Sequence, residues 1–146
     1  MDIFETETAI YRMIADNILL ATMKENAALD LVAVKENHGT AMRITNGERY
    51  VSLVDARTDL TITNEAKKYA AQPDIYETVI AQAVVITSLA AKLITNFILN
   101  FTRQNKDVGM KFFNDYDEAL TWLKAKLLDE QAALAMAKYK DKLKNH

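Results

Sequence analysis

The sequence predicts an α/β protein in which an N-terminal β-hairpin precedes alternating elements in the order αβαβαβα. The expected product is a mixed five-stranded sheet with helices packed across it. Three observations predict this class. Two short runs near the N-terminus are separated by a turn sequence, short and almost wholly apolar runs recur farther along the chain, and longer segments with helical spacing lie between them.

A hairpin is expected first. Residues 8–14 and 18–23 are short runs joined by a turn that contains Asp16 and Asn17. Because Asp and Asn tolerate positive φ, this turn can reverse the chain directly. The two runs are therefore predicted to pair as antiparallel strands.

A helix and a buried strand follow. Asn26 can cap a helix that runs to about Ile44, although residues 29–34 could instead form a strand. Asn46-Gly47 ends this segment. Residues 50–55, Tyr-Val-Ser-Leu-Val-Asp, are predicted to form a short strand of the apolar kind found in sheets covered on both faces.

The loop after this strand leads into a short helix. Thr61 or Thr63 can cap a helix over residues 64–72, and Pro73 would end it because proline cannot continue the helical hydrogen bonds. The N-terminal end of such a helix also favours a phosphate group. A phosphorylation switch at either threonine is therefore one hypothesis, and simple capping by Thr63 is the other.

The second half of the chain alternates in the same way. Residues 80–87 are another buried-strand candidate, and Ser88 stands where an N-cap belongs before a helix to about Thr102. Residues 108–113 predict the last strand. The final helix begins within residues 114–118 and has no breaker before the C-terminus.

These segments resemble a known family. The residues that carry the resemblance are Tyr50-Val51-Ser52-Leu53-Val54-Asp55, Ala83-Val84-Val85-Ile86-Thr87, Asn96-Phe97, and the run from Lys111 to Leu123 that reads KFFNDYDEALTWL. They look like the STAS-like proteins of bacteria, which are small relatives of anti-sigma-factor antagonists and of the cytoplasmic domains of sulfate transporters. The resemblance covers about residues 8–127, so residues 1–127 are expected to form the domain and residues 128–146 a helical extension.

The resemblance implies a non-catalytic binding or regulatory module. Some members of the family are phosphorylated at a Ser or Thr on the loop that enters the second helix. The antagonists carry Asp-Ser-Ser-Gly there, whereas this chain has Asp59-Leu60-Thr61-Ile62-Thr63-Asn64. Thr61 and Thr63 are the remaining hydroxyl candidates for a switch.

Composition argues against several classes of function. The chain has 146 residues, with 18 Lys and Arg against 20 Asp and Glu, and no cysteine. The resulting net charge of −2 argues against a nucleic-acid partner, and the missing thiols exclude thiolate zinc sites and cysteine nucleophiles. Polar residues interrupt the most apolar stretch, residues 79–101, so no membrane span is expected. The acidic start of the chain shows no secretory signal, which makes the cytoplasm the expected location.

Catalytic chemistry has few candidate residues. A Ser-His-acid site would have to use Ser52 or Ser88 with His38 or His146, and each serine is better explained by a strand or a helix cap. Two isolated histidines supply no zinc site, and single glycines form no phosphate-binding loop. We therefore expect no enzyme, no cofactor and no bound metal.

One sheet edge could still hold a ligand. If the late strands are parallel, their carboxyl ends bring together Asp55, Ser88, Asn114 and Asp115. A divalent ion, or a weakly supported enzyme, could use Asp55 and Asp115. Helix capping explains Ser88 and Asp115 equally well, because Asp115 has Glu118 at capping-box spacing.

The helix expected over residues 89–101 is apolar around most of its circumference. Leu99 falls within its polar arc, either as a lone exposed leucine or as part of a second apolar contact. Such a helix could also line a pocket, and CRAL-TRIO lipid-exchange proteins are similar in architecture. A carrier of a small apolar or lipid-like ligand is therefore the alternative to a protein-interaction module.

The last helix is too long for a compact domain. About 30 residues from Asp115 span about 45 Å, whereas a compact chain of this length has a diameter of roughly 38 Å. The distal half carries an apolar stripe of its own, formed by Leu128, Ala132, Ala135, Tyr139 and Leu143. Either a bend near Asp129 or a second subunit can bury it. We expect a homodimer, in which an acidic N-terminal segment (Asp2, Glu5, Glu7) complements the distal lysines.

Overall fold

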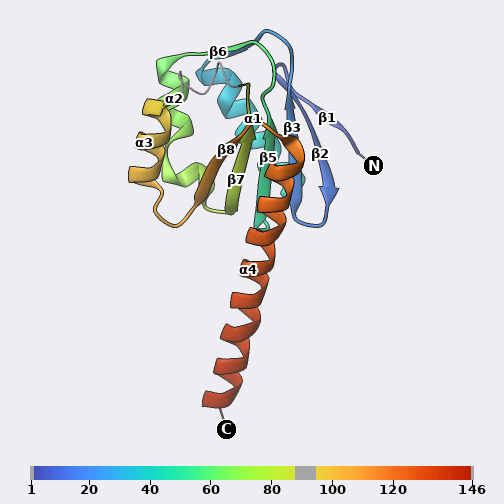
Figure 1. The fold of residues 1–146 in the computed structure, drawn as a ribbon, viewed down its shortest axis with the longest axis vertical. Helices are drawn as coiled ribbons and strands as arrows, with labels where there is room; N and C mark the ends of the chain where they lie inside the picture. The colour runs from blue at the N-terminus through green and yellow to red at the C-terminus, as the bar shows by residue number, and fades with distance from the viewer. Residues whose placement is uncertain (1, 88–94, 146) are drawn as a thin grey trace.

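A mixed sheet with helices on both faces is the centre of the computed structural model, which describes residues 2–87 and 95–145 (Figure 1). In these residues the sheet has six strands, in the order β1-β2-β3-β5-β7-β8. Their bounds are β1 (Phe4–Glu5), β2 (Ala9–Ala15), β3 (Ile18–Met23), β5 (Tyr50–Asp55), β7 (Val79–Val85) and β8 (Gly109–Phe113). The predicted α/β class and mixed sheet are confirmed. The predicted number of five strands is wrong, because the two-residue β1 adds a strand beside β2.

Strand direction divides the sheet into two parts. β1, β2 and β3 are antiparallel neighbours, which confirms the predicted hairpin, and Asn17 has a φ of 63° in its turn. β3, β5, β7 and β8 are parallel. The carboxyl ends of these four strands therefore share one edge, which we call the carboxyl edge.

The first helix begins later than the sequence predicts. α1 (Leu31–Thr45) is capped by Asp30, whose Oδ1 accepts a 2.8 Å hydrogen bond from the Ala33 N–H. The predicted cap, Asn26, is instead a turn residue with a φ of 58°, a conformation that Asn tolerates. The residues that follow this turn form a strand in a second, parallel two-stranded sheet, made of β4 (Ala27–Leu29) and β6 (Leu60–Ile62).

The remaining helical elements are α2 (Asn64–Ala70), the 3₁₀ helix η1 (Pro73–Tyr76), α3 (Thr95–Gln104) and α4 (Tyr116–Lys144). α2 ends before Pro73, as predicted, and Pro73 begins η1. Ser88, the predicted cap of the third helix, lies outside the described residues, and that helix is described only from Thr95 onward. No helix in the described part of the chain has both the length and the apolar content needed to cross a bilayer.

Two apolar cores lie on opposite faces of the sheet. On one face, Phe101 of α3 and Ala41 of α1 pack in a cluster with Leu19 of β3. On the other face, Leu123 of α4 packs in a cluster with Leu53 of β5 and with neighbouring strand residues. The sheet therefore has α1 and α3 on one side and α4 on the other, as Figure 1 shows.

α4 extends far beyond the sheet (Figure 1). It is continuous over 29 residues, about 44 Å of helix. Only Ala119 and Leu123 are buried, and residues 131–145, which we call the projecting half, are all exposed. The helix passes through Asp129 without a break, so a bend there does not bury the apolar stripe.

Candidate functional site

The carboxyl edge brings together three of the four residues predicted for it. Asp55 is the last residue of β5 and is level with Val85 of β7, which in turn is level with Phe113 of β8. Asn114 and Asp115 follow Phe113 directly, and both are exposed. The fourth, Ser88, is outside the described residues.

The Asp55 carboxylate forms an ion pair with Arg57. The Arg57 Nε donates to Asp55 Oδ1 and its Nη2 to Asp55 Oδ2, both at 2.9 Å. The side-chain hydrogen bonds from Arg57 hold the pKa of Asp55 below its ordinary value, against an opposing effect of burial. The guanidinium also lies 5.6 Å from the centre of the Tyr116 ring. Both carboxylate oxygens of Asp55 therefore bond to Arg57, which leaves little support for Asp55 as a metal ligand or a base.

Replacing Arg57 with Gln is expected to raise the pKa of Asp55 toward 3.8, which an NMR titration of the carboxyl carbon measures. Because folding lowers this pKa, the pair adds stability above pH 3.8 and loses it as the pH falls through the lowered value. We expect Arg57→Gln to cost at most about 1 kcal/mol near neutral pH and nothing in strong acid. Arg103→Gln, an exposed arginine on α3, is the control. An unchanged Asp55 pKa would contradict the ion pair.

Asp115 also has a local structural role. Its Oδ1 accepts a 2.9 Å hydrogen bond from the Glu118 N–H and so caps α4, as the capping hypothesis predicts. In the described ranges, no group of three or more His, Asp or Glu side chains is placed to hold a metal ion. Asp55 and Asp115 thus both have structural roles, whereas Asn114 is exposed.

The two predicted switch threonines lie in different elements. Thr61 is exposed in β6 and level with Ala28 of β4, whereas Thr63 caps α2 by accepting a 3.1 Å hydrogen bond from the Ala66 N–H. Capping is therefore sufficient to explain Thr63. The loop position expected for a phosphorylated residue belongs to Thr63 alone.

Thr63→Ala is expected to lower the free energy of unfolding by about 1 kcal/mol, because the Ala66 N–H loses its partner. Thr61→Ala, an equally conservative change at an exposed strand position, is expected to change it by less than about 0.5 kcal/mol. Urea unfolding followed by circular dichroism measures both. Equal effects would show that the cap contributes nothing.

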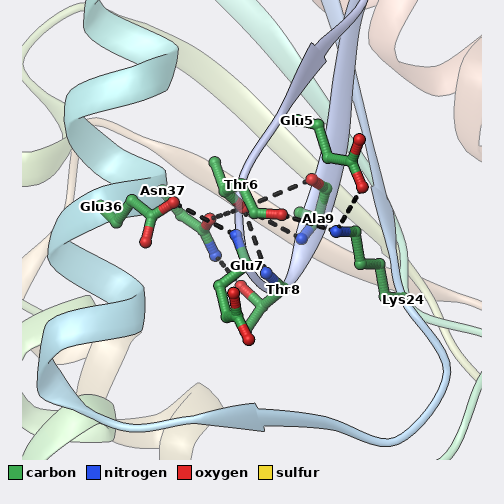
Figure 2. Close-up of polar contacts among 8 residues, drawn as sticks. All are labelled: Glu5, Thr6, Glu7, Thr8, Ala9, Lys24, Glu36 and Asn37. Carbon is green, nitrogen blue, oxygen red and sulfur yellow. Dashed lines mark hydrogen bonds and ion pairs between the residues drawn. The ribbon is translucent and has the colours of Figure 1, made fainter.

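A network of polar contacts ties the loop before β2 to α1 (Figure 2). The Asn37 Oδ1 accepts a 2.7 Å hydrogen bond from the Thr6 hydroxyl, and the Asn37 Nδ2 donates a 2.9 Å bond to the Thr8 hydroxyl. Lys24 donates to the Thr6 carbonyl at 2.7 Å and pairs with Glu5 at 2.6 Å. Thr6 and Thr8 are buried and satisfied, so the network has a structural role and positions α1 against the sheet.

The predicted interface residues do not form one patch. Leu128, Tyr139 and Leu143 are 65%, 59% and 59% exposed on α4. Leu99 is also exposed, but it lies on α3, across the sheet from α4. Leu134 and Met136 add exposed apolar surface to the projecting half. The interface candidates that lie on one element are therefore those of α4.

An ion pair marks the point where α4 leaves the body of the protein. Arg49 donates to Glu130 through Nε and Nη2, and through Nη1 to the Glu77 carbonyl at 3.2 Å. The hydrogen bond to Glu130 raises the pKa of Arg49. Glu130 is the last partly buried residue of the helix. The body thus fixes α4 up to this residue.

A cavity of about 150 Å³ lies between the sheet, α1 and α2. Its wall includes Ser52 and His38, the internal members of the Ser-His-acid site that the sequence disfavours, and it includes no Asp or Glu. Sequence reasoning missed this cavity and two of its buried tyrosines, Tyr11 and Tyr50. The alternation of buried and exposed residues along β2 could have indicated that Tyr11 is buried. No local sequence pattern indicates the cavity.

Comparisons with known proteins assign no activity. A family model described as a domain of unknown function, DUF7793, matches residues 12–127. No curated protein matches the chain, and no solved structure does. The matched region begins within β2, contains β3, β5, β7 and β8 and the first part of α4, and ends just before Leu128.

Proposed function

The chain belongs to the DUF7793 family, and we propose that it is a non-catalytic protein-interaction module that pairs with a second copy of itself through α4. The observation that carries this proposal is the exposure of every residue from 131 to 145, including Leu134, Met136, Tyr139 and Leu143. Contiguous apolar side chains on a helix seldom stay in water. The regulatory role implied by the STAS-like resemblance is consistent with such a contact and is part of the proposal.

The apolar stripe of α4 points away from the chain's own sheet. At about 100° per residue, Tyr139 lies about 160° around the helix from Leu123, which packs on the sheet. Leu128, Ala132, Ala135 and Tyr139 follow one another at steps of four, three and four residues, the spacing of a helix-pairing seam. Since the helix is continuous, a second helix is the natural cover for this seam.

Charge favours an antiparallel second copy. Asp129 lies at the near end of the seam, beside Glu130, which is already paired with Arg49, whereas Lys138, Lys140, Lys142 and Lys144 surround the far end. An antiparallel pair places the acidic end of each helix beside the basic end of the other, and a parallel pair places like charges together. The N-terminal acidic segment is a weaker complement, because Glu5 is already paired with Lys24.

The other functions considered have less support. A lipid carrier needs an apolar pocket of at least about 300 Å³. The cavity of about 150 Å³ is too small, and a larger hollow of about 450 Å³ has the charged residues Asp16, Glu48 and Arg49 in its wall. An enzyme based on Asp55 and Asp115 would compete with the Arg57 ion pair and the α4 cap. The interaction module requires no rearrangement of either group.

Full-length protein is expected to sediment as a dimer at micromolar concentration, and the double variant Tyr139→Glu/Leu143→Glu as a monomer, because two carboxylates cannot be buried in the seam. Gln131→Glu adds charge to the same helix away from the seam and should remain dimeric. Truncation after Leu127 should also give a monomer. A monomeric full-length protein would refute the proposal.

Disulfide trapping tests the antiparallel arrangement without background, because the chain has no cysteine. When the Leu128→Cys and Leu143→Cys proteins are mixed and oxidised, they should form a disulfide-linked heterodimer. Neither protein should form a disulfide-linked homodimer when it is oxidised alone. A parallel pair would instead cross-link Leu128→Cys to itself, since a disulfide requires Cα atoms within about 7 Å.

A further inference from the structure

The cavity between the sheet and α1 is lined by aromatic and polar side chains that carry no charge. Tyr11, Tyr50 and Ser52 are 7%, 5% and 7% exposed and line this cavity. His38 also lines the cavity, and its Nε2 is the buried side-chain atom that lacks a hydrogen-bond partner among the described residues. Buried polar atoms are normally satisfied, so this nitrogen calls for a partner.

The neighbouring polar groups are arranged differently. The Tyr76 hydroxyl, which also faces the cavity wall, donates to the Ala70 carbonyl at 2.5 Å. His38 Nδ1 lies 3.5 Å from the Tyr69 hydroxyl, and His38 Nε2 is buried without a partner in the described part of the chain. Burial lowers the pKa of His38, so its ring is neutral at neutral pH. The Tyr76 hydroxyl thus has a partner, whereas His38 Nε2 has none among the described residues.

The residues of the cavity wall disfavour a charged ligand. It contains no Asp, Glu, Lys or Arg. Burial raises the pKa of Tyr50 to about 12 and shifts the pKa of Tyr11 upward as well, so both phenols stay protonated. A charged ligand would lose its hydration without gaining a counter-ion. The fitting ligand is therefore neutral.

The size and the lining of the cavity limit which neutral ligands fit. A cavity of about 150 Å³ can hold a benzene-sized molecule. The aromatic rings of Tyr11, Tyr50, Tyr69 and Tyr76 contribute to its wall together with aliphatic side chains such as Leu19 and Val79. Aromatic walls favour aromatic guests through edge-to-face and offset packing. The wall hydroxyls and the unpartnered His38 Nε2 favour a guest with one or two hydrogen-bonding groups.

We propose that this cavity is a binding site for a neutral, single-ring aromatic compound that carries a hydroxyl or a carbonyl group. The ring lies among the tyrosine and aliphatic side chains, and the polar group exchanges hydrogen bonds with Tyr50 and its neighbours. The wall side chains from α1 and α2, among them Val34 and Tyr69, are partly exposed, so the ligand enters between these helices. This site stands apart from the pairing of α4, which lies across the sheet.

Phenol, benzene and benzoate are the probes, and the readout is an amide NMR titration of the full-length protein. Phenol should give saturable shifts at cavity residues, benzene should bind more weakly, and benzoate should not bind. Tyr50→Phe removes one hydroxyl and keeps the ring, so it should weaken phenol binding roughly fivefold and leave benzene binding unchanged. Tyr139→Phe, the same change on the projecting half, should alter neither.

Ala41→Leu, which fills the cavity from α1, should abolish binding of both phenol and benzene. If this variant is unfolded by circular dichroism, the comparison of Tyr50→Phe with Tyr139→Phe decides alone. Absence of saturable shifts with phenol up to its solubility limit overturns the proposal. So does benzoate binding as tightly as phenol, or equal phenol affinity in Tyr50→Phe and the unaltered protein.

Discussion

Replacing Leu123 with Ala is expected to lower the free energy of unfolding by about 3 kcal/mol. Leu123 is fully buried and packs in one cluster with Val51, Leu53 and Ala83 on the face of the sheet that α4 covers. Its loss removes apolar burial and leaves a cavity that the rigid sheet cannot close. Urea unfolding followed by circular dichroism, at a fixed protein concentration, measures the change.

Leu134→Ala is the matched control for this variant. It makes the same substitution on the same helix at a side chain that is 54% exposed, and the expected change is within about 0.5 kcal/mol. If Leu123→Ala costs no more than Leu134→Ala, α4 is not anchored on the sheet in solution, and the orientation of the projecting half is not fixed by the body.

Phe101→Ala is expected to cost about 4 kcal/mol. Phe101 is 1% exposed, and its ring meets the Tyr76 ring edge-on, with centroids 4.8 Å apart at an angle of 86°. The substitution therefore removes both apolar burial and an aromatic pair. The same denaturation experiment applies, and phenol titration of this variant also shows whether Tyr76 still forms the cavity wall.

Leu99→Ala tests whether the loss is specific to the buried position. Leu99 lies on the same helix two residues earlier and is 59% exposed, so its truncation should change the stability little. A loss of less than about 1 kcal/mol for Phe101→Ala would mean that α3 contributes little to the core.

Local sequence signals predicted much of the fold. The strand over residues 50–55 has the predicted bounds, because a short apolar run between a turn and a polar loop has few other uses. Thr63 and Asp115 act as helix caps, which was one of the two hypotheses for each residue. Capping is predictable from sequence because it depends only on residues three positions apart.

The errors have non-local causes. Asn26 looks like a helix cap in isolation, but the next three residues pair with β6 more than thirty positions away, so the helix starts only after Asp30. β1 spans two residues, which is too short to show alternation. Neither pairing leaves a pattern that can be read along the chain.

The candidate sites follow the same division. The position of Asp55, Asn114 and Asp115 at one edge follows from parallel strands and was predictable. The ion pair between Asp55 and Arg57 was not predictable, because an arginine two residues away in the sequence does not by itself indicate an ion pair. The cavity depends on how Tyr11 of β2 and Tyr50 of β5 pack beneath α1, which only tertiary structure determines.

The projecting half of α4 also works as a lever. Its tip lies about 21 Å beyond Glu130, so a tilt of 10° where the helix meets the sheet moves the tip by about 4 Å. Small changes in packing around Leu123, or in the Arg49–Glu130 ion pair, are thereby enlarged at the far end. In the proposed antiparallel pair, the packing of each sheet against its own helix would therefore set how the two bodies are oriented.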